Sequence, residues 1–264
     1  MKRHLSGRKI LITGASSGIG MYLAIHVARR GGIPILAARS VDRLRIISQH
    51  VQQEFEVPCY WYEADLSNDA DWKDVIDRIC FEHGPIDALI NNAGMAVFDY
   101  VSEAKWQDID RMLAVNVKSL IRTTHQLLPH FLNQKQGHVV NIASQAGKIA
   151  TPRSSVYSAS KHAVIGFTNA LRMEVEKDGV YVTSVNLGPV RTNFFKSADP
   201  SGGYEKAVEN VMLDPNKVAL SVVKHLFTKR REINLPAWMD SGSKAYQLAP
   251  GLVERGLKRQ FSKK

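Results

Sequence analysis

The chain has 264 residues, of which 44% are apolar and 23% charged, and its formal net charge is +10. These values are typical of a globular protein with one large α/β domain or two small ones. The sequence also argues against a membrane-spanning protein, because no apolar run approaches the roughly 20 residues that a spanning helix needs.

The positive charge would suit an anionic cofactor, a nucleic acid or an anionic membrane surface. The basic residues are spread along the chain, and no zinc-finger spacing or aromatic-interleaved basic strand is present, so we expect no nucleic-acid partner. The basic N-terminal stretch precedes only a short apolar run at 10–12, which predicts a first strand and not a signal peptide. Cys59 and Cys80 show neither disulfide nor metal spacing, so we expect a reducing, cytoplasmic location and no metal.

Short β-rich runs alternate with helical stretches along most of the chain. The expected strands cover 9–13, 33–38, 59–63, 87–91, 137–143, 181–186 and 232–235. The expected helices cover 19–30, 42–55, 70–82, 105–132, 154–177 and 215–228, with Asp42 capping the second and Pro129 interrupting the fourth. Such alternation predicts βαβ units on a parallel sheet covered on both faces. We expect an α/β fold with a Rossmann-like doubly wound parallel sheet, in a single domain over 1–264 with a core at about 8–235 and a C-terminal extension at 236–264.

A hydroxyl, a phenol and an amine follow the fifth expected strand, at Ser144, Tyr157 and Lys161. Because Tyr157 and Lys161 are four residues apart in an expected helix, their side chains share one face. Acid–base catalysis at neutral pH needs a phenol pKa nearer 7 than the usual value of about 10, a difference of roughly 4 kcal/mol. One close ammonium can supply much of that. The alternative is a packed aromatic and a solvated lysine, since Tyr-x-x-x-Lys occurs by chance in many helices.

A glycine-rich turn, Thr-Gly-Ala-Ser-Ser-Gly-Ile-Gly at 13–20, follows the first expected strand and opens the first helix. Its glycines allow the backbone to approach a pyrophosphate, and the helix N-terminus offers unpaired N–H groups and a favourable dipole. The expected phosphate-binding residues are Gly14, Ser16, Ser17, Gly18, Ile19 and Gly20.

Six motifs, in order, resemble those of the common type of short-chain dehydrogenase/reductase. They are the turn at 13–20, Asn-Asn-Ala-Gly at 91–94, Asn116, Ser144, Tyr157 with Lys161, and Gly-Pro-x-x-Thr at 188–192. The resemblance covers about residues 8–235. It implies an enzyme that transfers a hydride between a nicotinamide cofactor and a small-molecule carbonyl or alcohol substrate.

The resemblance also implies roles for single residues. Tyr157 would give its proton to the developing alkoxide while Ser144 holds the same oxygen. Lys161 would lower the pKa of Tyr157 and bind the nicotinamide ribose. Asn116 would anchor a water that links Lys161 to solvent.

Further cofactor contacts are implied at both ends of the dinucleotide. Asp65 matches the family residue that contacts adenine, and Thr192 would hold the carboxamide. The other implied contacts are Leu66, Asn91, Asn92, Ala93, Gly94, Pro189 and Val190.

The choice between the two nicotinamide dinucleotides depends on the end of the second expected strand. An acidic residue there binds the 2′-OH of NAD, whereas a basic residue accommodates the 2′-phosphate of NADP. The chain has Arg39 and Ser40 at this point and no acid. An arginine–phosphate pair, discounted for solvent, favours NADP by roughly 1–3 kcal/mol. We expect NADP, with Ser16 adding a hydrogen bond; the alternative is that Arg39 points to water.

The segments that would meet the substrate are apolar. Phe194, Phe195 and Tyr204 would form one wall of a pocket, and residues 96–98 the other, so we expect an apolar carbonyl compound. The turn-forming stretch at 199–203 suits a lid.

The extension at 238–264 mixes apolar side chains with a basic end. It could pack on its own subunit, join an oligomer interface, cover the substrate site or touch a membrane surface. Because the family is commonly dimeric or tetrameric, we expect a homodimer or homotetramer.

Two alternatives to this function remain open at the level of sequence. A 3-oxoacyl thioester reductase would bring an anionic carrier to a basic rim. A non-catalytic NADP-binding sensor would leave Ser144, Tyr157 and Lys161 without a use.

Overall fold

Parallel strands in one sheet form the centre of the structure, a computed structural model that describes residues 4–261. The sheet has the order β3-β2-β1-β4-β5-β6-β7. Its strands are β1 (Lys9–Thr13), β2 (Ile33–Ala38), β3 (Tyr60–Glu63), β4 (Ala88–Asn91), β5 (Gly137–Ile142), β6 (Val180–Leu187) and β7 (Glu232–Leu235). The order reverses between β1 and β4, so the carboxyl ends of these two strands flank the switch point where such sheets bind ligands.

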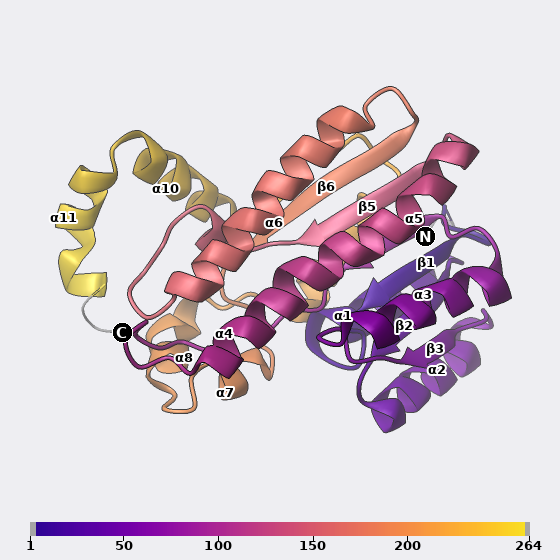
Figure 1. Cartoon of the computed structure of the whole chain (residues 1–264), viewed down its shortest axis with the longest axis horizontal. Coiled ribbons are helices and arrows are strands. Elements are labelled where there is room, and N and C mark those ends of the chain that lie inside the picture. The colour runs from indigo at the N-terminus through magenta and orange to yellow at the C-terminus, as the bar shows by residue number, and fades with distance from the viewer. Residues whose placement is uncertain (1–3, 262–264) are drawn as a thin grey trace.

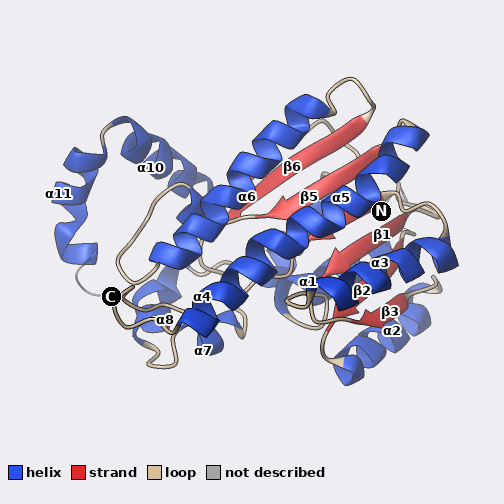
Figure 2. Ribbon diagram, in the orientation of Figure 1, coloured by secondary structure: helices blue, strands red, loops and turns tan. Residues whose placement is uncertain are grey.

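Helices cover both faces of the sheet, as Figures 1 and 2 show. The helices are α1 (Gly18–Arg29), α2 (Val41–Phe55), α3 (Asp69–His83), α4 (Trp106–Leu113), α5 (Ser119–Gln134), α6 (Ser155–Glu174), α7 (Phe194–Ala198), α8 (Gly203–Val208), α9 (Pro215–Lys224), α10 (Ala237–Leu248) and α11 (Pro250–Phe261). None of these described helices is long and apolar enough to cross a membrane.

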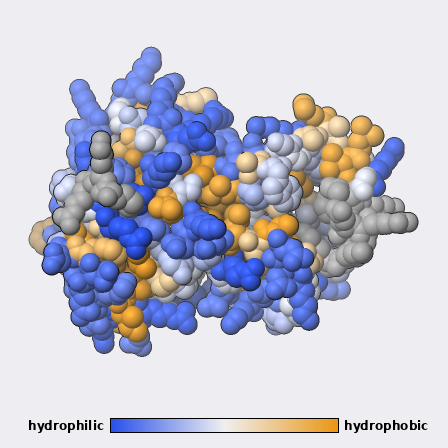
Figure 3. All heavy atoms as spheres, turned by 180° about the vertical axis from the view of Figure 1, so that it is seen from behind, coloured by the Kyte–Doolittle hydropathy of each residue, from blue (hydrophilic) through white to orange (hydrophobic). Residues whose placement is uncertain are grey.

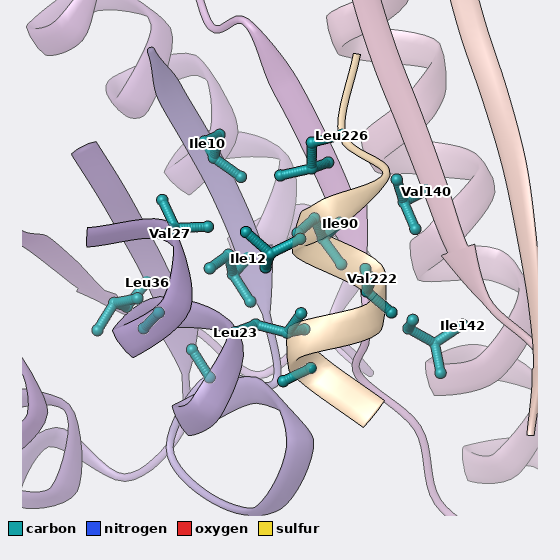
Figure 4. Close-up of a cluster of buried hydrophobic side chains, with 14 of the residues drawn as sticks. Ile10, Ile12, Leu23, Val27, Leu36, Ile90, Val140, Ile142, Val222 and Leu226 are labelled. Atoms are coloured by element: carbon teal, nitrogen blue, oxygen red, sulfur yellow. The ribbon is translucent and has the colours of Figure 1, made fainter. Parts of the chain in front are cut away.

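Two apolar cores result, because successive side chains of a strand point to opposite faces. Ile10 and Ile12 of β1 pack with Leu23 of α1 and Val222 of α9 in one core, shown in Figure 4. Leu11 lies in the other core, against α3, α5 and α6. Strands that are buried on both faces are apolar almost throughout, which explains why the runs at 10–12 and 88–90 lack polar alternation.

The expected elements are present, with differences of one to four residues at most ends and three further differences. The long helix is interrupted at Ala114–Lys118, a wider π-turn that contains Asn116, and not at Pro129, which lies inside α5. The expected cap at Asp42 is also wrong: the cap of α2 is Ser40, and Asp42 falls in the first turn. The segment 191–214, for which the sequence predicts neither a strand nor a helix, contains α7 and α8.

The C-terminal extension forms α10 and α11, which project from one end of the molecule (Figure 1). The first turns of α10 pack on their own chain, where Ser243 is buried. Farther along, Leu248 and Leu252 are exposed, and Figure 3 shows apolar side chains gathered on this projecting end. Packing on its own chain is therefore present for the start of the extension. The alternatives of contact with an oligomer partner, the substrate site or a membrane surface stay predictions.

Candidate active site

The glycine-rich turn lies at the carboxyl end of β1 and is fixed from the neighbouring strand. Thr13 Oγ1 accepts hydrogen bonds from the backbone N–H groups of Asn92 (3.0 Å) and Ala93 (3.1 Å). The Asn92 amide donates to the carbonyl oxygens of Thr13 (3.0 Å) and Gly14 (3.2 Å). The motif at 91–94 thus holds the shape of the turn.

The turn has no room for side chains at its glycines. Gly14 has φ +65°, and a Cβ there would lie 2.8 Å from Ala93 Cα. A Cβ on Gly20 would lie 2.3 Å from the Gly14 carbonyl oxygen. The first turn of α1 contains no acidic residue and its Ser17 cap makes no side-chain hydrogen bond, so the N-terminal N–H groups face a site suited to an anion.

A cleft of about 330 Å³ opens over this turn, at the switch point of the sheet. Most of the sequence-predicted cofactor residues line it: Gly14, Ser16, Ser17, Gly18, Ile19, Arg39, Ser40, Asp65, Leu66, Asn92, Ala93, Gly94 and Thr192. The structure also brings Arg111 and Val115 to the cleft, which sequence reasoning missed. Their i, i+4 spacing marks a shared helix face, but only the fold places that face over the cleft.

Six predicted cofactor residues do not line the cleft: Tyr157 and Lys161, described below, and Gly20, Asn91, Pro189 and Val190. Asn91 is buried in the sheet, where its amide donates to Thr124 Oγ1 (3.2 Å) and Asn141 Oδ1 (2.8 Å), so its assignment as a lining residue was wrong. Gly20 lies beneath the turn. Pro189 accepts a backbone hydrogen bond from Leu213 (2.8 Å), and Val190 is mostly buried beside the same strand-like segment.

Ser144 caps a short 3₁₀ turn, Gln145–Gly147, at the end of β5. Its hydroxyl accepts from the Ala146 N–H (3.1 Å) and donates to the Leu187 carbonyl oxygen (3.3 Å). A Cβ on Gly147 would lie 2.6 Å from the Lys161 carbonyl oxygen. The turn that carries Ser144 is therefore seated directly on the helix that carries Tyr157 and Lys161.

Tyr157 lies beneath aromatic rings from two other segments. The ring centroid of Phe98 is 5.8 Å from that of Tyr157, and the ring of Phe194 is 5.9 Å away. Burial raises the pKa of Tyr157 to about 12, and the hydrogen-bonding Ser144 hydroxyl opposes this only in part. The expected lowering of the Tyr157 pKa is therefore wrong for the chain by itself.

The position of Lys161 explains this outcome. Its Nζ donates to the Ile142 carbonyl oxygen (3.0 Å) and is 5.8 Å from the Tyr157 ring centroid. Burial lowers the pKa of Lys161 to about 8. A Cβ on Gly94 would lie 3.6 Å from Nζ, so the ammonium sits directly under the wall of the cleft.

Asn116 lies in the π-turn between α4 and α5 and is buried. Its amide donates to the Met95 carbonyl oxygen (2.8 Å) and to Ser160 Oγ (3.0 Å), and its Oδ1 accepts from the Met95 N–H (2.8 Å). Wide turns of this kind often occur at functional sites. Asn116 thus joins the cleft wall at Met95 to the helix of Tyr157 and Lys161, and its expected water stays a prediction.

Comparison with known proteins agrees with this geometry. Residues 8–201 match the family model described as short chain dehydrogenase. This chain is a short-chain dehydrogenase. An uncharacterised oxidoreductase of Staphylococcus saprophyticus is 33% identical over 83% of this chain and 91% of its own length.

Solved structures of similar proteins have the same fold. A short-chain dehydrogenase from Sphingobium yanoikuyae, in complex with NADPH, superposes with a TM-score of 0.82 at 28% identity, over 96% of this chain and 95% of its own. An alcohol dehydrogenase from the archaeon Thermococcus sibiricus, complexed with 5-hydroxy-NADP, gives a TM-score of 0.78 at 26% identity, over 87% and 96% of the two chains. Family membership makes this chain an oxidoreductase.

Proposed function

We propose that this short-chain dehydrogenase transfers a hydride between NADP(H) and an apolar carbonyl or alcohol substrate, with Tyr157 as general acid and base. The observation that carries the proposal is the meeting of the Ser144 turn, Tyr157 and Lys161 beside a cleft with an anion-suited helix N-terminus. The glycine-rich turn fits a dinucleotide. A side chain at Gly14 or Gly20 would clash with backbone atoms, so only glycine permits the tight turn that brings the backbone close to a pyrophosphate. When bound, the nicotinamide would supply or accept the hydride.

The residues around the substrate oxygen would handle its proton. At neutral pH a phenol with a pKa of about 12 is protonated, so Tyr157 is in the form that donates a proton to an alkoxide. Ser144 would hold the same oxygen by a hydrogen bond. Lys161, which keeps its charge below a pKa of about 8, would bind the nicotinamide ribose and favour the phenolate that remains after donation. In these protonation states the enzyme is ready to protonate the alkoxide that carbonyl reduction forms at neutral pH.

The positive charge in the part of the cleft next to the end of β2 supports NADP over NAD. Arg39 and Ser40 are exposed and line the cleft at the end of β2. Arg111 also lines the cleft. Burial acts to raise the pKa of Asp65, but hydrogen bonds from Ser67 and the charges of both arginines outweigh it and lower this pKa. Two cations near one carboxylate suit an added phosphate. The bound forms of the Sphingobium and Thermococcus proteins agree with this choice.

An aromatic cluster over Tyr157 supports an apolar substrate. Phe98 contacts Tyr204 at a centroid distance of 4.8 Å, and Phe195 stacks on Tyr204 at 5.5 Å. The two walls are joined by a hydrogen bond from the Phe98 N–H to the Ala198 carbonyl oxygen (2.8 Å). A bound carbonyl compound would replace part of this aromatic contact on Tyr157, which favours an apolar or aromatic group beside the carbonyl.

The test begins with NADPH and NADH titrations, followed by a panel of aryl, alkyl and polar carbonyl compounds with one 3-oxoacyl thioester. We expect tighter NADPH binding, a preference reduced about ten- to a hundredfold in Arg39→Ala, and oxidation of NADPH by apolar members. Tyr157→Phe should abolish turnover and leave NADPH binding intact. Binding without turnover of any carbonyl would favour the sensor, turnover of the thioester alone would favour the thioester reductase, and NADH preference would refute the role of Arg39.

A further inference from the structure

Lys148 is a buried charge that the proposed chemistry does not use. It directly follows the 3₁₀ turn that Ser144 caps, and its side chain is only 9% exposed. Its Nζ donates to Glu232 Oε2 (2.7 Å) and Asn234 Oδ1 (3.1 Å) of β7, and to Asp240 Oδ1 (2.9 Å) of α10. One side chain thus joins the Ser144 turn to the last strand and to the C-terminal extension.

The two acidic partners are held in their charged forms. Burial acts to raise the pKa of Glu232, but hydrogen bonds from Lys148 and Asn234 outweigh it and lower this pKa. Hydrogen bonds from Lys244 and Lys148 lower the pKa of Asp240. Since the cost of removing charges from water offsets much of their attraction, a buried cluster of this kind is a weak source of stability and is better suited to fixing geometry.

Further contacts carry the cluster to the groups around the substrate oxygen. The Asn186 amide donates to Asn234 Oδ1 (2.7 Å) and Glu232 Oε2 (3.2 Å), and the Asn186 carbonyl oxygen accepts from the Gln145 amide (3.2 Å). The next carbonyl oxygen along β6, that of Leu187, accepts from the Ser144 hydroxyl (3.3 Å). The turn is therefore held from both of its ends, at Gln145 and at Lys148.

The extension reaches the same region by a second contact. The residue before Asp240 is Met239, whose Sδ would lie 2.6 Å from a Cβ on Gly188. Gly188 begins the Gly-Pro-x-x-Thr motif, and its N–H donates to the Leu235 carbonyl oxygen (2.7 Å). The start of α10 thus packs against two of the motifs that surround the site.

We propose that Lys148 is a positioning residue, which fixes the Ser144 hydroxyl over Tyr157 by tying its turn to Glu232 and to Asp240 of the C-terminal extension. The proposal rests on the proposed function, since it assigns Lys148 an effect through Ser144. It gives the first turns of α10 a role in the reaction without any contact to substrate or cofactor.

The test is a mutant cycle in the full-length enzyme with NADPH and the best carbonyl of the panel. We expect Lys148→Met to lower kcat by about 10- to 100-fold while the NADPH dissociation constant changes less than about twofold. In the Ser144→Ala background the same substitution should change kcat less than about twofold, because the group through which it acts is gone. Lys148→Arg, which keeps the charge and its donors, should recover most of kcat.

Lys244→Met is the matched control, because Lys244 binds the outer oxygen of Asp240 (2.7 Å) but is 69% exposed. Its kcat should stay within about twofold of the wild type. If Lys148→Met does not fold, Asp240→Asn replaces it in the cycle. Equal losses of kcat with and without Ser144, or no loss in either background, would overturn the proposal.

A second measurement does not depend on turnover. Hydrogen exchange of the NADPH-bound protein should be faster at residues 147–149 in Lys148→Met and unchanged in β1 and β2, because only the turn loses an anchor. Unchanged exchange at 147–149 would overturn the proposal even if the wild type reduced no carbonyl. Absence of any wild-type turnover would refute the proposed function, and the exchange result would then decide the proposal for Lys148 by itself.

Discussion

His138 of β5 provides a test of how strongly burial controls charge in this fold. It is 1% exposed, and burial lowers its pKa from the usual 6.5 to about 3. Its Nδ1 accepts from the Phe227 N–H (2.9 Å), so Nε2 carries the proton and donates to Thr183 Oγ1 (2.9 Å). Protonation of Nδ1 would lose the first bond and bury a charge.

The consequence for stability has a definite sign. Because the folded pKa lies below the unfolded one, the unfolded chain binds the extra proton as the pH falls below 6.5, and stability falls by about 1.4 kcal/mol per pH unit until about pH 3. Between pH 7 and pH 4 this residue should cost about 3 kcal/mol of unfolding free energy. His138→Asn keeps an acceptor for Phe227 and removes the titration.

Urea unfolding of the wild type and His138→Asn at pH 7, 6, 5 and 4 measures the effect, since other titrating groups cancel in the difference. The difference in unfolding free energy should move by about 3 kcal/mol in favour of the variant at pH 4. Two parallel pH profiles would show that the unfolded and folded states bind this proton equally, and would refute the reasoning.

Two further predictions concern the site itself. Gly20→Ala should weaken dinucleotide binding by at least about tenfold in a fluorescence titration, because its Cβ would lie 2.3 Å from the Gly14 carbonyl oxygen; unchanged affinity would mean that the turn shifts at no cost. Alcohol oxidation needs Tyr157 as a phenolate, so its kcat should rise with pH through pH 7–10 while carbonyl reduction stays flat below pH 8. A plateau of the oxidation rate already at pH 7 would instead show that bound cofactor lowers the Tyr157 pKa strongly.

The predictions that failed depend on contacts between residues that are far apart along the chain. The spacing of Tyr157 and Lys161 is a local property of one helix, and it was read correctly. The direction of the Tyr157 pKa was not, because it depends on rings brought from Phe98 and Phe194, far away in sequence. Asn91 fails for a similar reason, since its partners Thr124 and Asn141 lie on other elements.

The sequence by itself determined the parallel sheet, the glycine-rich turn and the family, because strand–helix alternation, helical spacing and turn chemistry are short-range properties written along the chain. Only the tertiary structure decided which side chains are buried from water and which distant side chains are in contact. Burial shifts the pKa values of Tyr157, Lys161 and His138. Lys148 binds Glu232 and Asp240, which follow it in the chain by 84 and 92 positions. No local sequence pattern carries information over such a separation. Desolvation and long-range contact are sums over the whole fold, and they exist only once the chain has closed on itself.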